Sequence, residues 1–201
     1  MHPALADHLR GVAVFRGVLK RTGPSDLSRA TPCAGWTVRE LLAHQLGQDR
    51  AFTAALRGGS ATVADWAPIP VGDDVPGPNL AALEEQQRVL ADFGDPAERT
   101  IWMPEILPNS PLSATGALSA HLIDLVVHSW DLAAALGVPL DVDDDLVQFC
   151  LGTARAIPDD PDRRGAGQAF DRALPLPDEV GAFDEVLLRL GRDPGWRPPA
   201  P

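Results

Sequence analysis

The segment from His121 to Gly137, with the sequence HLIDLVVHSWDLAAALG, constrains the fold of this chain more than any other. Wound as an α-helix, it is apolar on most of its circumference, yet it carries two histidines and two aspartates. A helix that is apolar nearly all round is normally buried in a protein core. The chain therefore has to pack around this helix, and the polar groups on the helix need partners.

The polar side chains of this segment fall on one side of the predicted helix. At 100° per residue they share an arc of roughly 80°. The arc could be the solvent face of an amphipathic helix, but residues 112–137 contain no Lys, Arg or Glu, which such faces usually recruit. A buried hydrogen-bond network or a metal site is the alternative explanation. The members of the arc are His121, Asp124, His128 and Asp131.

Length and composition indicate one globular domain. The chain has 201 residues, of which 45% are hydrophobic and 22% charged, and it has a formal charge of -11. Such an acidic chain repels phosphate backbones, so we expect no nucleic acid partner. We expect no membrane span and no signal peptide. With Cys33 and Cys150 as the only cysteines there is no disulfide framework, and a cytoplasmic location is expected.

Apolar residues at helical spacing predict an all-α fold. We expect an up-down four-helix bundle, followed by extra short helices and long loops. Thr37 and Glu40 form a capping box for the second helix, which stops at Gly58-Gly59. The other helices are predicted at residues 4–21, 79–93, 112–136, 143–156 and 181–191. Asn79 is expected to cap the helix at 79–93, and Gly137 to close the helix at 112–136. Loops are predicted at 60–78 and 158–177, and a short extended piece at 100–106.

His44 on the predicted second helix adds to the polar arc. It lies within ELLAHQLGQD, with leucines around it and no charge directly beside it. A lone histidine on an apolar face is commonly a hydrogen-bonded core residue. If the second helix packs beside the fourth, however, His44 becomes a third ligand next to Asp124 and His128. Two histidines and one carboxylate leave an open coordination position, the pattern of a catalytic metal site.

Two longer motifs resemble a known family. TPCAGWTVRELLAHQLG and DLVVHSWDLAAALG are similar to the DinB-like four-helix-bundle metalloproteins, in the actinobacterial branch related to the N-terminal domain of mycothiol-dependent maleylpyruvate isomerase. The tail LLRLGRDPGW resembles the end of many members. The resemblance implies a single DinB-like domain over residues 1–201, with His44, Asp124 and His128 as ligands of a divalent metal. The isomerase has a glutamate where this chain has Asp124.

The resemblance also implies an activity. We expect zinc or nickel, and mycothiol or another low-molecular-weight thiol, with a metal-bound thiolate that attacks a small electrophile. The protein would then be a thiol S-transferase or isomerase. A metal-dependent hydrolase, which uses metal-bound water, is an alternative. A second alternative is a bundle that binds a small molecule or a metal without catalysis.

The remaining residues of interest have weaker patterns. His121 is either a fourth ligand or proton carrier, or a hydrogen-bonded residue beside the site. Asp131 either holds the far nitrogen of a ligand histidine or caps a helix. We expect Cys33 to be a packing residue rather than a nucleophile, and Trp36 and Trp130 to lie in the core.

The substrate pocket and the assembly state are the least defined by the sequence. We expect the pocket walls to come from residues 60–78 and 100–112. Dimerisation is common in such bundles, so a homodimer is one possible assembly, but no stripe of residues points to an interface.

Overall fold

The computed structural model describes the chain except for residues 105–106, 108, 162–163, 166–169 and 200–201. Most of the described chain is helical, with a single small antiparallel ladder. The helices are α1 (Pro3–Leu19), α2 (Val38–Gly58), α3 (Gly77–Ala91), α4 (Ala114–Leu136), α5 (Asp144–Ala156) and α6 (Ala182–Arg189). The short elements are the 3-10 turns η1 (Pro24–Asp26), η2 (Val63–Trp66) and η3 (Pro96–Glu98) and the strands β1 (Thr100–Ile101) and β2 (Leu112–Ser113).

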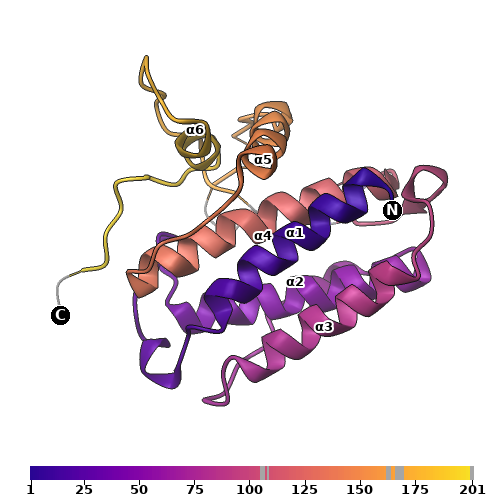
Figure 1. The fold of residues 1–201 in the computed structure, drawn as a ribbon, viewed down its shortest axis with the longest axis horizontal. Coiled ribbons are helices and arrows are strands. Elements are labelled where there is room, and N and C mark those ends of the chain that lie inside the picture. Colours follow the sequence, from indigo (N-terminus) through magenta and orange to yellow (C-terminus); the bar gives the residue numbers. More distant parts are fainter. Residues whose placement is uncertain (105–106, 108, 162–163, 166–169, 200–201) are drawn as a thin grey trace.

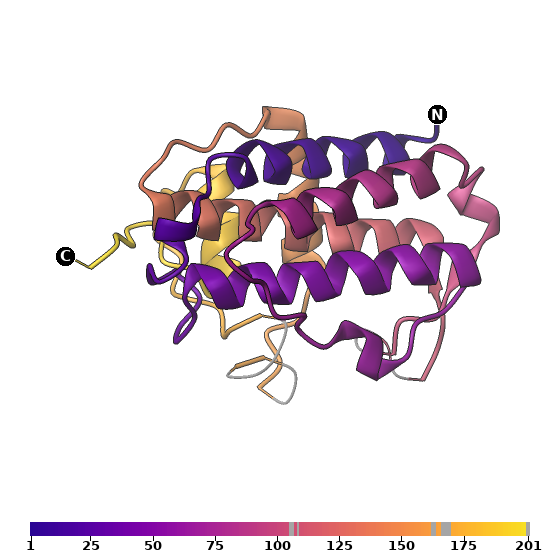
Figure 2. The same ribbon diagram turned by 90° about the horizontal axis from the view of Figure 1, so that it is seen from below.

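Helices α1 to α4 form a four-helix bundle, as the sequence predicts, but consecutive helices do not all alternate in direction as in a simple up-down bundle, and α5 and α6 follow as extra short helices (Figures 1 and 2). Helices α1 and α4 run in the same direction, because His8 early in α1 contacts His121 early in α4. Helices α2 and α3 also run in one direction, since Asn79 in the first turn of α3 contacts Leu42 near the start of α2. Residues 59–76 therefore return along the length of the bundle.

Helix α4 is buried along most of its length, as its sequence predicts. Helix α1 approaches it closely, and Gly11 makes this approach possible. A Cβ atom at Gly11 would lie 2.3 Å from Cδ1 of Leu122, a distance that real Cβ atoms do not show. On its other sides α4 contacts α2 and α5. The central position of α4 explains why its sequence lacks long charged side chains.

The capping box at Thr37 is confirmed, but Asn79 is not the cap of α3. The Thr37 amide and hydroxyl groups both donate to Oε2 of Glu40 at 2.6 Å. Helix α3 instead begins at Gly77, and Asn79 is fully buried in its first turn. The Asn79 side-chain amide donates to the Leu42 carbonyl group at 2.9 Å. The prediction was wrong because this amide ties α3 to α2 rather than closing a helix end.

Other boundaries differ by a few residues. Helix α4 starts at Ala114 rather than 112, because Leu112–Ser113 pairs with β1 and the Ser113 hydroxyl group caps the helix. The extended piece predicted at 100–106 is confirmed at Thr100–Ile101, whereas residues 105–106 lie outside the described part. Asp143 caps α5 by accepting from the Leu146 amide group. Trp130 is only half-buried, so its assignment to the core was wrong.

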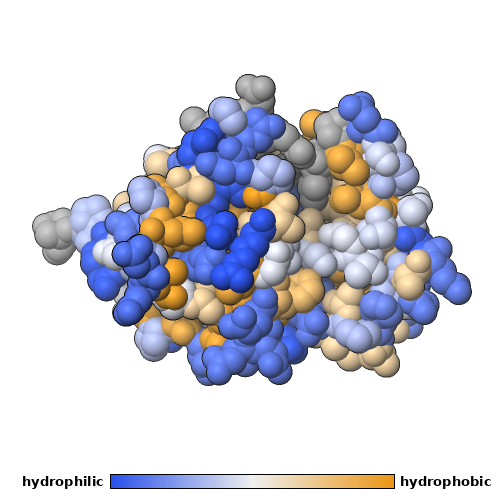
Figure 3. Space-filling view, turned by 90° about the horizontal axis from the view of Figure 1, so that it is seen from above, coloured by the Kyte–Doolittle hydropathy of each residue, from blue (hydrophilic) through white to orange (hydrophobic). Residues whose placement is uncertain are grey.

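Helices α5 and α6 lie together on one side of the bundle (Figure 1). The Glu185 carboxylate on α6 accepts hydrogen bonds from Arg155 on α5 and from Arg189 one turn further along α6. The face seen in Figure 3 mixes hydrophobic patches with hydrophilic residues. Among the described residues, no helix is both long and apolar enough to cross a membrane.

Candidate metal centre

Three potential metal ligands meet between α2 and α4. His44 comes from α2, and Asp124 and His128 lie one turn apart on α4. One ligand atom from each residue lies within 4.8 Å of the other two. The imidazole rings of His44 and His128 have centroids 5.1 Å apart and are tilted by 73°. We refer to these three residues as the candidate metal cluster.

Two atoms of this cluster are buried without a hydrogen-bond partner among the described residues. They are Nε2 of His128 and Oδ2 of Asp124. The Nε2 atom lies 3.3 Å from Oδ1 of Asp124, an ion-pair distance without hydrogen-bond geometry. Buried polar atoms are almost always paired, so two unpartnered atoms in one cluster leave room for a partner. Imidazole nitrogen and carboxylate oxygen are the donors that Zn²⁺ and Ni²⁺ accept, so the residues fit a divalent cation.

The electrostatics of the cluster also suit a cation. Burial lowers the pKa of His44 to about 4, and the charge of His128 adds to this effect. His44 is therefore neutral at pH 7 and has a free lone pair. Burial alone would raise the pKa of Asp124, but the charge of His128 outweighs it and holds the pKa well below its usual range. Burial alone would lower the pKa of His128, whereas Asp124 and Asp131 raise it.

The other ring nitrogen of His128 is held by Asp131. Nδ1 of His128 and Oδ2 of Asp131 lie 2.9 Å apart, and Asp131 is fully buried. Metal-binding histidines usually need such a carboxylate on the far nitrogen, which fixes the ring and its tautomer. This contact gives Asp131 the geometry expected of an outer partner to the cluster.

Cys33 packs in the core, as the sequence predicts, and also touches this carboxylate. Its thiol group donates to Oδ2 of Asp131 at 3.0 Å, and its sulfur lies 4.0 Å from Nδ1 of His128. Sequence reasoning found no link between Cys33 and the histidines. Cys33, His128 and Asp131 also lie within ligand distance of one another, but the Arg192 guanidinium group contacts both the sulfur and the carboxylate. A positive charge at that point disfavours a second cation.

Trp36 lies beside the cluster rather than deep in the core. Its ring centroid is 5.0 Å from that of His44 and 6.4 Å from that of His128, and the side chain is half-buried. Trp36 packs against the core, as predicted, while the turn before α2 also presents its indole ring to the imidazoles. The predicted loop 60–78 also comes close, since the Ile69 amide group donates to the carbonyl group of Ala43.

His121 belongs to a different group of residues. Its Nδ1 atom is hydrogen-bonded to Nε2 of His8 at 3.0 Å, and its Nε2 atom lies 3.3 Å from Oδ1 of Asp49. Its ring is stacked on Phe52 with centroids 4.1 Å apart. Among the described residues, the sets within ligand distance of one another do not include His121. We refer to His8, Asp49 and His121 as the interior cluster.

Sequence reasoning missed His8 and Asp49. Both are fully buried, on α1 and α2 respectively. The Asp49 carboxylate accepts a hydrogen bond from the side-chain amide group of Gln45, one turn earlier on α2. The signal that could have found Asp49 is a carboxylate on the mostly apolar side of the predicted second helix, in line with Gln45. His8 has no comparable signal, because a single histidine among apolar neighbours fits many packed helices.

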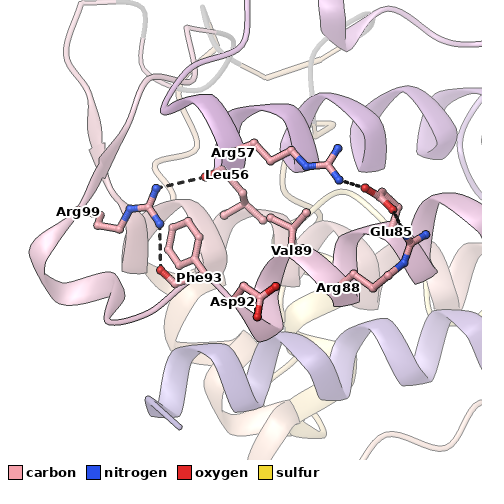
Figure 4. Close-up of a pocket in the computed structure, with 8 residues that line it drawn as sticks. All are labelled: Leu56, Arg57, Glu85, Arg88, Val89, Asp92, Phe93 and Arg99. Carbon is pink, nitrogen blue, oxygen red and sulfur yellow. Dashed lines mark hydrogen bonds and ion pairs between the residues drawn. The ribbon is translucent and has the colours of Figure 1, made fainter.

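A surface hollow of about 350 Å³ lies between α2, α3 and the segment before β1 (Figure 4). Its cationic side chains are already engaged. Arg57 and Arg88 both pair with Glu85, and Arg99 lies over the Phe93 ring, 3.9 Å from its centroid. No residue of the candidate metal cluster lines this hollow.

Comparisons with known proteins agree with this arrangement. The family model described as the mycothiol maleylpyruvate isomerase N-terminal domain matches residues 9–133, which include both clusters except for His8. Two relatives, each named as an uncharacterized protein of Mycobacterium tuberculosis (MT0763 and Rv0738), are 29% identical over 194 residues, 96% of this chain and 98% of theirs. No solved structure gives a significant match. The chain, an all-α DinB-like bundle, therefore belongs to the mycothiol maleylpyruvate isomerase N-terminal domain family.

Proposed function

We propose that this protein is a divalent-metal-dependent transferase or isomerase that uses a low-molecular-weight thiol, of the mycothiol class, to attack a small electrophile. The observation that carries the proposal is the candidate metal cluster, in which one ligand atom from each residue lies within 4.8 Å of the other two, and Nε2 of His128 and Oδ2 of Asp124 are buried without partners among the described residues. The family supports the thiol, because its name links this domain to a mycothiol-dependent isomerase.

Under this proposal His44, Asp124 and His128 hold the cation, with zinc as the first candidate and nickel as the second. When bound, a divalent cation with an open position favours the thiolate form of a thiol at neutral pH. The neutral His44 offers its lone pair without losing a proton. The Asp124 carboxylate supplies the negative charge that offsets the cation. Asp131 keeps a proton on Nδ1 of His128, so that Nε2 is the nitrogen that faces the site.

The surroundings of the cluster limit the access of water. His128 is buried, while His44 and Asp124 are half-buried, so the cluster opens to the surface on the side of these two residues. Trp36 covers part of this opening with its indole ring. An apolar wall next to an ion strengthens the electrostatic interactions at the reacting centre. We propose that the thiol and the electrophile enter beside Trp36.

The test compares turnover with and without a thiol. The protein is loaded with zinc or nickel and incubated with mycothiol and a panel of small electrophiles, with cysteine as a second thiol. We expect turnover that depends on thiol, and loss of turnover in Asp124→Asn, which keeps the size of the side chain but removes its charge. Absence of thiol-dependent turnover for every electrophile in the metal-loaded protein would contradict the proposal.

A hydrolase is the second candidate for the same residues, and one observation disfavours it. Hydrolysis needs a carboxylate that is free to take a proton from water, and Asp131 is the carboxylate that contacts His128 from outside the candidate metal cluster. Its Oδ2 atom is already shared by His128, Cys33 and Arg192, and its Oδ1 atom is buried away from water. Turnover of an ester or amide panel without added thiol would favour the hydrolase. Metal binding without turnover of either panel would favour a bundle that only binds small molecules.

A further inference from the structure

Arg192, in the segment after α6, lies against the back of the candidate metal cluster. It is 6% exposed, although arginines are almost never buried without a partner. One of its terminal nitrogens lies 3.3 Å from Oδ2 of Asp131 and 3.2 Å from the sulfur of Cys33. Its other terminal nitrogen donates to the Leu190 carbonyl group at 2.9 Å. The guanidinium group thus joins the C-terminal segment to α4 and to the turn before α2.

The end of α6 is built to place Arg192 at this point. Gly191 adopts a left-handed conformation with φ of 77°, which ends the helix. A Cβ atom at Gly191 would lie 2.6 Å from Cβ of Asp171 and 2.8 Å from the Arg172 carbonyl oxygen, so no larger residue fits. The Arg192 amide group then donates to the carbonyl group of Leu187 at 2.8 Å. The direction of the Arg192 side chain is therefore fixed by the backbone.

Oδ2 of Asp131 is the atom on which these contacts converge. It accepts from the Cys33 thiol group, lies beside the Arg192 guanidinium group, and pairs with Nδ1 of His128. The other carboxylate oxygen of Asp131 has no hydrogen-bond partner among the described residues. Without the guanidinium group, Asp131 would be a buried carboxylate held by one thiol and one imidazole. A buried charge that loses its partner either moves or takes up a proton.

We propose that Arg192 is a positioning residue of the candidate metal cluster, which holds Asp131 so that Nε2 of His128 faces His44 and Asp124. This inference rests on the proposed function, since it assumes that the cluster binds a divalent cation. It goes beyond the family match, because the match ends at residue 133 and Arg192 lies far outside it. The segment after α6 is then a part of the site rather than an appendage to the bundle.

The first experiment measures metal affinity by competition with a chelator. Outer partners of metal ligands typically contribute 10–100-fold to affinity, so we expect Arg192→Ala to bind zinc about 10–100-fold more weakly than the wild type. Arg192→Lys, which keeps the charge, should recover part of this loss. Arg197→Ala removes an equal charge from the same tail, where the hydrogen bonds of Arg197 to described residues go to backbone carbonyl groups, and should leave the affinity unchanged.

The second experiment separates positioning from general loss of structure. In the Co²⁺-loaded protein we expect Arg192→Ala to change the visible ligand-field spectrum, because the geometry of His128 changes. In a protein that already carries Asp131→Asn, we expect Arg192→Ala to weaken zinc binding by less than about a further threefold, because the two changes remove the same interaction. If Arg192→Ala does not fold, as judged by circular dichroism, Arg192→Gln serves in its place.

The outcomes are distinguishable. Wild-type affinity and spectrum in the Arg192 variants, together with loss of metal in His128→Ala, would overturn this inference and leave the proposed function standing. The inference would also be overturned if the losses of zinc affinity in Arg192→Ala and Asp131→Asn multiply in the double variant. Tighter zinc binding in Arg192→Ala would assign the metal to Cys33, His128 and Asp131 instead. Equal metal content in His128→Ala and the wild type would remove the proposed function itself.

Discussion

The candidate metal cluster and the interior cluster contain the same residue types and share helices α2 and α4, while the interior cluster also takes His8 from α1. Each has two histidines and one aspartate, and each draws on α2 and α4. In the interior cluster the ring nitrogens of His121 face His8 and Asp49, and the ring is stacked on Phe52. In the candidate metal cluster one ligand atom from each of the three residues lies within 4.8 Å of the other two, and among the described residues the sets at such distances do not include the interior cluster.

This difference shows that composition does not decide whether such a cluster binds a metal. The three residues of the interior cluster are all buried, and His8 is hydrogen-bonded to His121, while Nε2 of His121 lies at an ion-pair distance of 3.3 Å from Oδ1 of Asp49. His44 and Asp124 of the candidate metal cluster are half-buried, and Nδ1 of His128 is held by Asp131. A site needs donors whose lone pairs converge, a path for entry and an outer partner that fixes the ligand. By this reasoning the interior cluster stabilises the fold.

The largest expected effect is on the stability of the metal-free protein. His121→Ala removes a ring stacked between Phe52 and His8 and leaves Asp49 buried with only Gln45 as a partner. We expect the free energy of unfolding to fall by about 3–5 kcal/mol. His44→Ala, at a half-buried position, should cost about 1 kcal/mol. Urea denaturation of both variants measures the difference, and equal losses would show that the two clusters do not differ in this way.

The next largest effect is on zinc affinity. Here a change in the candidate metal cluster should matter more than a change in the interior cluster. His128→Ala should lower zinc affinity by more than about 100-fold, equivalent to about 2.7 kcal/mol, because it removes a direct ligand rather than an outer partner. The matched control is the conservative change His121→Gln, which removes the other buried histidine of α4 and should leave zinc affinity within about threefold. Chelator competition measures both. A large loss in His121→Gln would show that the interior cluster takes part in binding.

Part of this comparison could be predicted from the sequence. The apolar circumference of α4 indicated burial, and the lack of Lys, Arg and Glu indicated that its polar arc is not a solvent face. The sequence could not assign the two α4 histidines to different clusters, because both lie on one side of the helix about two turns apart. That assignment depends on where α1 and α2 cross α4, which places His8 beside His121 and His44 beside His128.

The role of the C-terminal segment was outside the reach of sequence reasoning for a related reason. Arg192 and Cys33 are 159 residues apart, and neither has a helical or strand-like spacing that would indicate the contact. The capping box at Thr37 was predictable because its contacts span only three residues. Contacts within an element follow from local spacing, whereas contacts between distant elements need the packing of the whole bundle.

A smaller effect concerns pH. Burial and the nearby His121 hold the pKa of His8 well below the ordinary value of 6.5. The unfolded chain therefore binds a proton at His8 below pH 6.5 that the folded protein does not bind, so stability falls as the pH drops from 6.5 towards the folded pKa. The contribution of His8 should approach about 1.4 kcal/mol per pH unit in that range.

Urea denaturation of the wild type and His8→Gln at pH 7, 6 and 5 tests this expectation. The glutamine variant keeps a polar side chain at the site but does not titrate, so its stability should fall less steeply below pH 6.5. A parallel decline of the two proteins would show that His8 does not stay neutral in the folded state.

The smallest expected effect concerns the carboxylate that distinguishes this chain from the isomerase that it resembles. Asp124 lies one turn before His128, with its Oδ1 atom 3.3 Å from Nε2 of that histidine. Asp124→Glu adds one methylene group at a half-buried position where the side chain can bend, so zinc affinity should change by less than about tenfold. Asp124→Asn removes the charge at equal size and should weaken binding more than Asp124→Glu does. If the glutamate variant instead binds more weakly than the asparagine variant, then side-chain length rather than charge governs this position, and the spacing between α2 and α4 in this chain is fitted to an aspartate.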